Sequence, residues 1–296
     1  MSAPYFTLPE FKYVKPGSLD EALKLLKENE GAAKIMNGGI GLLGFMKERL
    51  LEAQIVVDIK GIPELKKIEY IPGKGLLVGA TVTANETKEF LEQNPELKEK
   101  YRALYEAAQV MADAIIRNRA TLVGNILEGL PYVDVPGPAV LFDAEVHAVS
   151  AEGDRWLPVD GLVLGPATTN LLPTEIVTEI LFREPPVGGR STYVKMQSRT
   201  EYGIVNLSAL IANPNDPGKR DVRLVVTSAT QLPYRAREFE ERLKRAERIE
   251  DVLEGEVDNM ISKLDVIEDP YASAEFRKHL IKVLTLKAMK TLLSGE

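Results

Sequence analysis

The first sixty residues alternate between short apolar runs and amphipathic stretches, which is the pattern of strands and helices in turn. Ser18 and Glu21 form the capping-box pattern that begins a helix, and apolar residues then repeat at helical spacing for about ten residues. A second helix is expected over residues 42–50. Strands are expected at 11–14, 33–36 and 55–59. This β-α-β-α-β order predicts a compact parallel sheet.

The pattern from residue 60 to residue 182 is mixed, with strands and helices in no simple alternation. Residues 151–154 have the composition of a tight turn and separate two alternating runs, which predicts a β-hairpin of residues 144–159. The other elements expected here are a strand at 76–80 and helices at 84–91 and 104–116. This region is therefore predicted to be an α+β domain.

The last third of the chain predicts a sheet covered by helices. Residues 213–218 are rich in proline and asparagine and form an emphatic turn between two strands. The expected strands are 193–197, 205–211 and 222–227. Apolar residues keep one face from Phe276 onward, behind a helix-start signal at Asp269 and Pro270. A three-stranded antiparallel sheet with a helical bundle is the expected arrangement.

Length and composition agree with a globular protein of several domains. A chain of 296 residues can bury more than one hydrophobic core, and we expect an α/β domain at 1–59 and α+β domains at 60–182 and 183–296. The net charge of −7 argues against nucleic acid or anionic lipid as the main partner. No apolar run approaches membrane-spanning length, and no signal-peptide pattern is visible, so a cytoplasmic location is expected.

The chain contains no cysteine, which removes several kinds of site. This polypeptide cannot hold a disulfide, a cysteine-ligated iron–sulfur cluster, a thiolate zinc site or a cysteine nucleophile. His147 and His279 are far apart in sequence and are expected to be surface or packing residues. The usual signatures of hydrolases, Walker loops and Rossmann folds are absent. A bound cofactor would therefore have to supply the chemistry of any active centre.

Two glycine-bearing turns are the strongest candidates for a binding site. Each places small residues and backbone N–H groups after an apolar run, so that the backbone can approach phosphate oxygens. The candidate residues are Lys34, Ile35, Met36, Asn37, Gly38, Gly39, Ile40, Gly41, Leu42 and Leu43 in the first turn, and Thr121, Val123, Gly124 and Asn125 in the second. Either turn alone also fits an ordinary connection between elements. Together they predict a two-sided cradle for a diphosphate.

Asp134 follows the second turn and has two interpretations. Its carboxylate could accept hydrogen bonds from ribose hydroxyls, a role that acids commonly play in dinucleotide sites. It could equally be the N-cap of a helix that begins at Val135 and Pro136.

The ordered set of these segments resembles the FAD-binding medium subunit of molybdenum hydroxylases, a family that includes carbon monoxide dehydrogenase medium subunits and the flavin domain of xanthine dehydrogenase. The resemblance covers nearly the whole chain. It is carried by residues 11–22, 37–39, 46–47, 57–59, 78–80, 116–125, 141–146, 195–205 and 271–277.

The resemblance implies a two-subdomain FAD-binding fold of the vanillyl-alcohol oxidase type, followed by a C-terminal α+β domain. FAD would lie between the subdomains with its diphosphate against both turns. By position, Asp134 would contact the ribose, Met111 would pack beside the cofactor, Val177 would lie under the ring, and Lys195 would be a basic residue close to the flavin. Met111 and Val177 could also be plain core residues.

The resemblance also implies an electron-transfer subunit with no catalytic residue of its own. Large and small partner subunits would carry the molybdenum cofactor and 2Fe–2S clusters, in a dimer of heterotrimers, and electrons would pass through FAD to an external acceptor. A self-contained flavin oxidoreductase is a second possibility. A scaffold with weakened or lost FAD binding is a third, because Ile40 and Gly41 replace polar residues of the family pattern, Val123 replaces a glycine, and residues 199–203 form a shortened motif.

Overall fold

The first unit of the fold is a parallel three-stranded sheet with two helices. The structure is a computed structural model that describes residues 7–197 and 202–295. Strands β1 (Lys12–Val14), β2 (Ala33–Met36) and β3 (Ile55–Asp58) pair in the order β1-β3-β2, and all pairs are parallel. Helices α1 (Leu19–Glu28) and α2 (Ile40–Lys47) connect them. The predicted β-α-β-α-β unit is confirmed, with the second helix beginning and ending earlier than expected.

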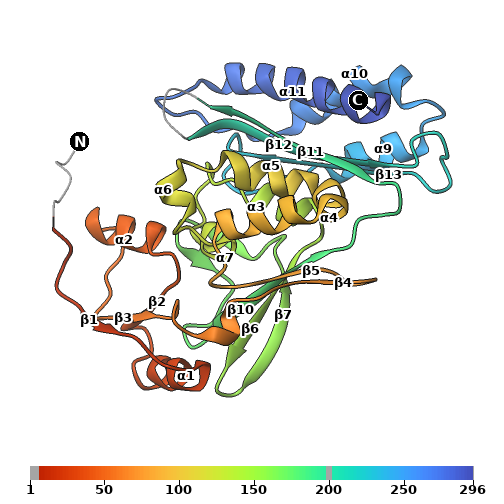
Figure 1. Ribbon diagram of the computed structural model, residues 1–296. Helices are drawn as coiled ribbons and strands as arrows, with labels where there is room; N and C mark the ends of the chain where they lie inside the picture. Colours follow the sequence, from red (N-terminus) through yellow and green to blue (C-terminus); the bar gives the residue numbers. More distant parts are fainter. Residues whose placement is uncertain (1–6, 198–201, 296) are drawn as a thin grey trace.

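The middle unit is an antiparallel sheet with helices on one face (Figure 1). Its strand order is β4-β5-β10-β6-β7, and β6 and β7 form the predicted hairpin. The strands are β4 (Ile68–Ile71), β5 (Gly75–Gly79), β6 (Glu145–Ser150), β7 (Gly153–Pro158) and β10 (Ile176–Arg183). The helices are α3 (Ala84–Gln93), α4 (Pro95–Lys100), α5 (Arg102–Val110), α6 (Ala114–Arg117), α7 (Leu122–Leu127) and α8 (Pro136–Leu141). A short 3₁₀ turn, η1 (Pro63–Leu65), precedes β4, and a small pair, β8 (Val163–Gly165) and β9 (Thr168–Thr169), follows β7.

The helix expected over residues 104–116 is interrupted. It divides into α5 and α6 because Ala112 adopts a φ of +36°, outside the helical region. The guanidinium of Arg117 donates to the carbonyl oxygens of Met111 and Ala112, and Asp113 caps α6 by accepting from Ile116 N at 2.7 Å. These contacts satisfy the backbone groups freed by the break.

The C-terminal unit is a four-stranded antiparallel sheet, β11-β12-β13-β14, with helices on both faces. Figure 1 shows α5 beneath it and α11 above it. The elements are β11 (Arg190–Gln197), β12 (Gly203–Ala212), β13 (Asp221–Thr227), β14 (Tyr234–Arg235), α9 (Arg237–Arg245), α10 (Ile249–Lys263) and α11 (Ala274–Ser294). The three predicted strands are present, and the short β14 was not foreseen. The last helix begins after Ser273, its N-cap, rather than at Asp269 and Pro270.

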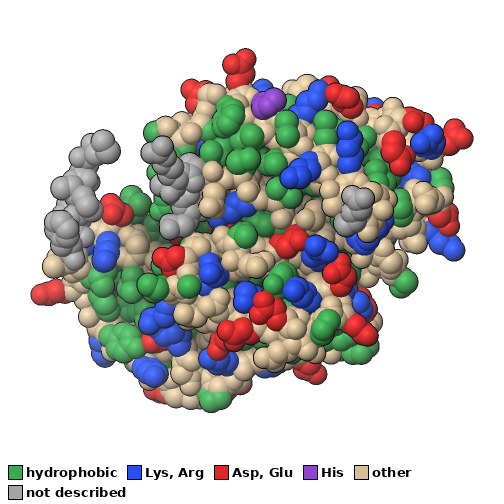
Figure 2. All heavy atoms as spheres, turned by 45° about the horizontal axis from the view of Figure 1, so that its top comes forward, with side chains coloured by type: hydrophobic (Ala, Val, Ile, Leu, Met, Phe, Trp, Pro, Cys, Tyr) green, Lys and Arg blue, Asp and Glu red, His purple; other side chains and the backbone are tan. Residues whose placement is uncertain are grey.

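The hydrophobic cores join these units. Tyr193, Leu210 and Val225 of the C-terminal sheet belong to the core of the middle unit, while the opposite face of that sheet packs on α9, α10 and α11. Ile176 of β10 lies in the core beneath the N-terminal sheet. On the face shown in Figure 2, acidic and basic side chains are interspersed and form no basic stripe.

Candidate functional site

The two glycine turns lie against each other at the junction of the N-terminal and middle units. A Cβ atom added to Gly38 would overlap the carbonyl oxygen of Arg119, so only glycine permits this approach of two backbones. Asn37 also reaches across the junction, because its Nδ2 atom donates to the carbonyl oxygen of Ala80 at 3.1 Å. The structure therefore brings together two segments that are far apart in sequence, as the pattern predicts.

The first turn leads from β2 into the start of α2. Lys34, Ile35 and Met36 belong to β2, and Gly39 caps α2 with a φ of +83°, a left-handed conformation that glycine adopts readily. Residues 40–43 form the first turn of α2, where the backbone N–H groups of residues 40–42 have no acceptor within the helix. These groups and the helix dipole favour an anion. Ile40 is 37% exposed, so an apolar side chain lies at the surface of this turn.

The second turn is the start of α7. Thr121 caps this helix, and its hydroxyl accepts from Gly124 N at 3.0 Å. Asn125 Oδ1 accepts from Val135 N at 2.9 Å, which fixes the following loop. Val123 is 1% exposed and lies in the hydrophobic core of the middle unit. The family's missing glycine is therefore replaced by a core side chain, and backbone N–H groups remain the main donors that this turn can offer.

Two features of this junction fit a bound diphosphate. Two helix starts meet here without a side chain at Gly38 to separate them. A polar cavity of about 220 Å³ borders the second turn, and its lining includes Lys60, Arg119 and Thr121. Basic groups and free backbone N–H groups suit phosphate oxygens.

Asp134 is part of a buried ion pair. Its carboxylate lies 2.9 Å from Lys195 Nζ and accepts from the Tyr193 hydroxyl at 2.7 Å. Burial raises the pKa of Asp134, although Lys195 and Tyr193 both favour the carboxylate. The N-cap alternative is wrong, since Val135 occupies the cap of α8 and no side chain caps that helix. A ribose hydroxyl would have to share a carboxylate that already has two partners.

Met111 and Val177 are both core residues of the middle unit. Met111 follows α5 and is 2% exposed, while Val177 lies on β10 and is 5% exposed. Their packing inside one hydrophobic cluster agrees with the plainer of the two interpretations. A place beside the flavin stays a prediction for each.

Glu128 lies next to the first turn, which the sequence pattern did not indicate. It follows α7, and a Cβ atom added to Gly41 would lie 2.9 Å from its carboxyl carbon. Burial raises the pKa of Glu128 to about 7. The available signal for Glu128 was a charged residue directly after the apolar helix 122–127. Its contact with Gly41 could not be predicted, because the two residues are far apart in the sequence.

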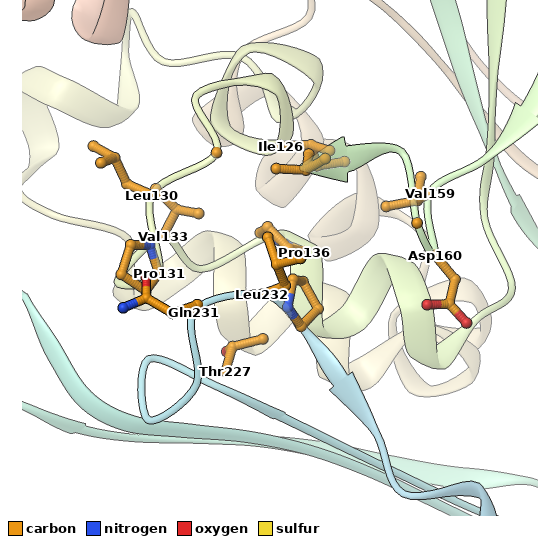
Figure 3. A pocket seen from close by; sticks show the side chains of 14 residues that line it. Ile126, Leu130, Pro131, Val133, Pro136, Val159, Asp160, Thr227, Gln231 and Leu232 are labelled. Carbon is orange, nitrogen blue, oxygen red and sulfur yellow. The ribbon is translucent and has the colours of Figure 1, made fainter. Parts of the chain in front are cut away.

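A second cavity lies between the middle unit and the C-terminal sheet (Figure 3). Its volume is about 160 Å³, and Ile126, Pro136 and Leu232 give it a largely apolar lining. Thr227 lines it as well, and the Thr227 hydroxyl has no partner among the described residues.

The two histidines lie outside the junction. His147 stacks on Trp156 with ring centroids 4.7 Å apart, and His279 is exposed on α11. Among residues 7–197 and 202–295, no group of three or more His, Asp and Glu side chains could hold a metal ion. In the same residues, no helix combines the length and the hydropathy needed to cross a membrane.

Comparison with known proteins shows relatives along the whole chain. Residues 9–182 match the FAD binding domain in molybdopterin dehydrogenase, and residues 192–292 match the CO dehydrogenase flavoprotein C-terminal domain. The glyceraldehyde dehydrogenase medium chain of Sulfolobus acidocaldarius is 28% identical, over 95% of this chain and 98% of that one. The carbon monoxide dehydrogenase medium chain of Hydrogenophaga pseudoflava is 27% identical, over 95% and 96%.

Solved structures share the fold. A carbon monoxide dehydrogenase from Hydrogenophaga pseudoflava that lacks the Mo-pyranopterin moiety matches with a TM-score of 0.89 and 26% identity, covering 98% of this chain and 99% of that one. The two matched domains agree with the contact between the two glycine turns. They also agree with the three units of the fold. The chain belongs to the FAD-binding medium subunits of the molybdenum hydroxylases.

Proposed function

We propose that this chain holds FAD across its two glycine turns and carries electrons between partner subunits and an external acceptor. The observation that supports this most strongly is the backbone contact at Gly38, which brings the segments before α2 and α7 together. When bound, FAD would accept and release the electrons. The chain's own part is to bind the cofactor, orient it and shield it.

Most of the predicted residues have a defined task in this proposal. Backbone N–H groups of residues 40–42 and 122–123 would donate to diphosphate oxygens, with Asn37 beside them in the first turn. Asp134 and Lys195 would form the polar end of the site, and Met111 and Val177 its apolar wall. Val123 would act through its backbone alone, because its side chain is in the core.

The names of the relatives support the proposed partner subunits. Several relatives are named as medium chains or subunits, which implies further chains beside them. Because this chain has no cysteine, any cysteine-bound iron–sulfur clusters of the complex must lie in other chains. We propose a large molybdopterin-binding subunit and a small 2Fe–2S subunit, assembled as a dimer of heterotrimers in the cytoplasm.

A reconstitution experiment tests the proposal. The purified full-length chain, freed of flavin, is titrated with FAD while flavin fluorescence and absorbance are followed. Stoichiometric binding is the expected result, and a chain that binds no FAD would instead support the scaffold alternative. Isolation from the source cells distinguishes the remaining alternatives. Co-purifying large and cysteine-bearing small chains support the subunit proposal, whereas a single chain that turns over a substrate alone supports a self-contained oxidoreductase.

A further inference from the structure

We propose that Glu128 fills the place left empty by the missing side chain at Gly41, and that FAD binds to the form of the protein in which this carboxyl group carries a proton. This inference rests on the proposed function, because it concerns how the same cradle accepts a diphosphate. It assigns a ligand-contacting role to a residue outside the two glycine turns.

The contact between Glu128 and Gly41 carries the first step. A Cβ atom added to Gly41 would lie 2.9 Å from Cδ, 3.0 Å from Cγ and 3.3 Å from Oε1 of Glu128. The end of the glutamate side chain therefore occupies the volume that a side chain at residue 41 would need. Gly41 is in the first turn of α2, where free N–H groups favour an anion. A carboxyl group thus lies against the first turn of α2.

Among the described residues, no cationic side chain pairs with the carboxylate of Glu128. Its side chain is half-buried, and among the described residues it has neither a hydrogen bond nor an ion pair. The first turn of α2 contains no charged residue, and the charge of Glu128 raises the pKa of one described titratable group, Tyr132. Burial holds the pKa of Glu128 near 7. At neutral pH the carboxyl group is therefore divided between its two forms.

A diphosphate changes the balance between these forms. Two anions in contact repel each other, whereas a protonated carboxyl group can donate a hydrogen bond to a phosphate oxygen. Binding of FAD should therefore take up a proton when the pH is above about 7. For a single group with a pKa near 7 in the free protein, the dissociation constant should rise about tenfold between pH 6 and pH 8.

The test is a fluorescence titration of the flavin-free, full-length chain with FAD at pH 6, 7 and 8. For the wild type we expect about tenfold weaker binding at pH 8 than at pH 6. Glu128→Gln keeps the size of the side chain but cannot ionise, so its affinity should vary less than about twofold over this range. Glu30→Gln, at an exposed position in the N-terminal unit, is the matched control and should behave like the wild type.

A second variant tests the same contact by changing its other residue, Gly41. Gly41→Ala places a methyl group where the Glu128 carboxyl lies, and the flexible end of that side chain can turn away. Its pH dependence should therefore also weaken, and adding Glu128→Gln should change little more. An unchanged pH dependence in Glu128→Gln would overturn the inference while leaving FAD binding intact. Absence of FAD binding to the wild type at every pH would overturn the proposed function and, with it, this inference.

Discussion

Asp134, Lys195 and Tyr193 form a charged group in the interior of the protein. The Asp134 and Lys195 side chains are 6% and 4% exposed, and they connect the loop before α8 to strand β11. Removing two charges from water is costly, and this pair offsets that cost only while both partners are present. Loss of one partner should therefore be more damaging than loss of both.

Replacing the cation tests this reasoning. Lys195→Met leaves Asp134 buried without a counter-charge, and we expect a loss of about 3 kcal/mol in the free energy of unfolding at pH 8. The pKa of Asp134 is raised further in this variant, so the lost stability should return as the pH falls towards 5. Urea unfolding at both pH values measures the effect.

The double variant Lys195→Met with Asp134→Asn is the control for this prediction. It carries no buried charge at the pair and should be more stable at pH 8 than Lys195→Met alone. The coupling of Asp134 and Lys195 would be contradicted if the double variant lost as much stability as Lys195→Met and Asp134→Asn lose separately, added together.

At the level of elements, local sequence signals predicted most helices and strands. They did not predict the helix ends and breaks that tertiary contacts determine. The Ser18 cap and the parallel order of β1, β2 and β3 follow from residue types and spacing. The break after α5 was missed because it depends on Arg117 reaching the carbonyl oxygens of Met111 and Ala112. Nothing in the propensities of residues 104–116 indicates that contact.

In the candidate site, too, local signals identified some features and missed those that depend on tertiary contacts. The glycine turns were identifiable because close backbone approach requires glycine, and Gly38 provides that approach. The role of Glu128 was not identifiable, since its contact with Gly41 exists only after two distant helices are packed together. Val123 was placed in the cradle by motif position, although its side chain belongs to the core.

The contact between the two turns leads to a prediction about Gly38. In Gly38→Ala the new methyl group meets the backbone of Arg119, which cannot turn away as a side chain can. The turns must separate, and we expect FAD affinity to fall by at least about tenfold. Fluorescence titration with FAD measures this loss.

Gly44→Ala is the matched control, because it lies in the same helix α2 and an added Cβ meets nothing within 4 Å. It should keep the affinity of the wild type and raise stability by about 0.5–1 kcal/mol, since alanine favours a helix over glycine. Equal affinities for Gly38→Ala and Gly44→Ala would show that the approach of the two turns does not matter for binding.

At the level of the whole molecule, three units are arranged so that the candidate cradle lies at a junction rather than inside one core. The middle and C-terminal units share hydrophobic residues, including Tyr193 and Val225, while the N-terminal unit meets the middle unit through Ile176 and the glycine turns. The boundaries predicted at residues 59 and 182 stay predictions. A cofactor between units would hold the N-terminal unit and the middle unit together.

The most direct test of this account is an experimental structure of the full-length chain with FAD bound. We predict that the diphosphate lies between the first turns of α2 and α7, within hydrogen-bond distance of backbone N–H groups of both helices. A diphosphate that contacts one of these turns alone, or neither of them, would contradict the claim that the two glycine turns form a single cradle.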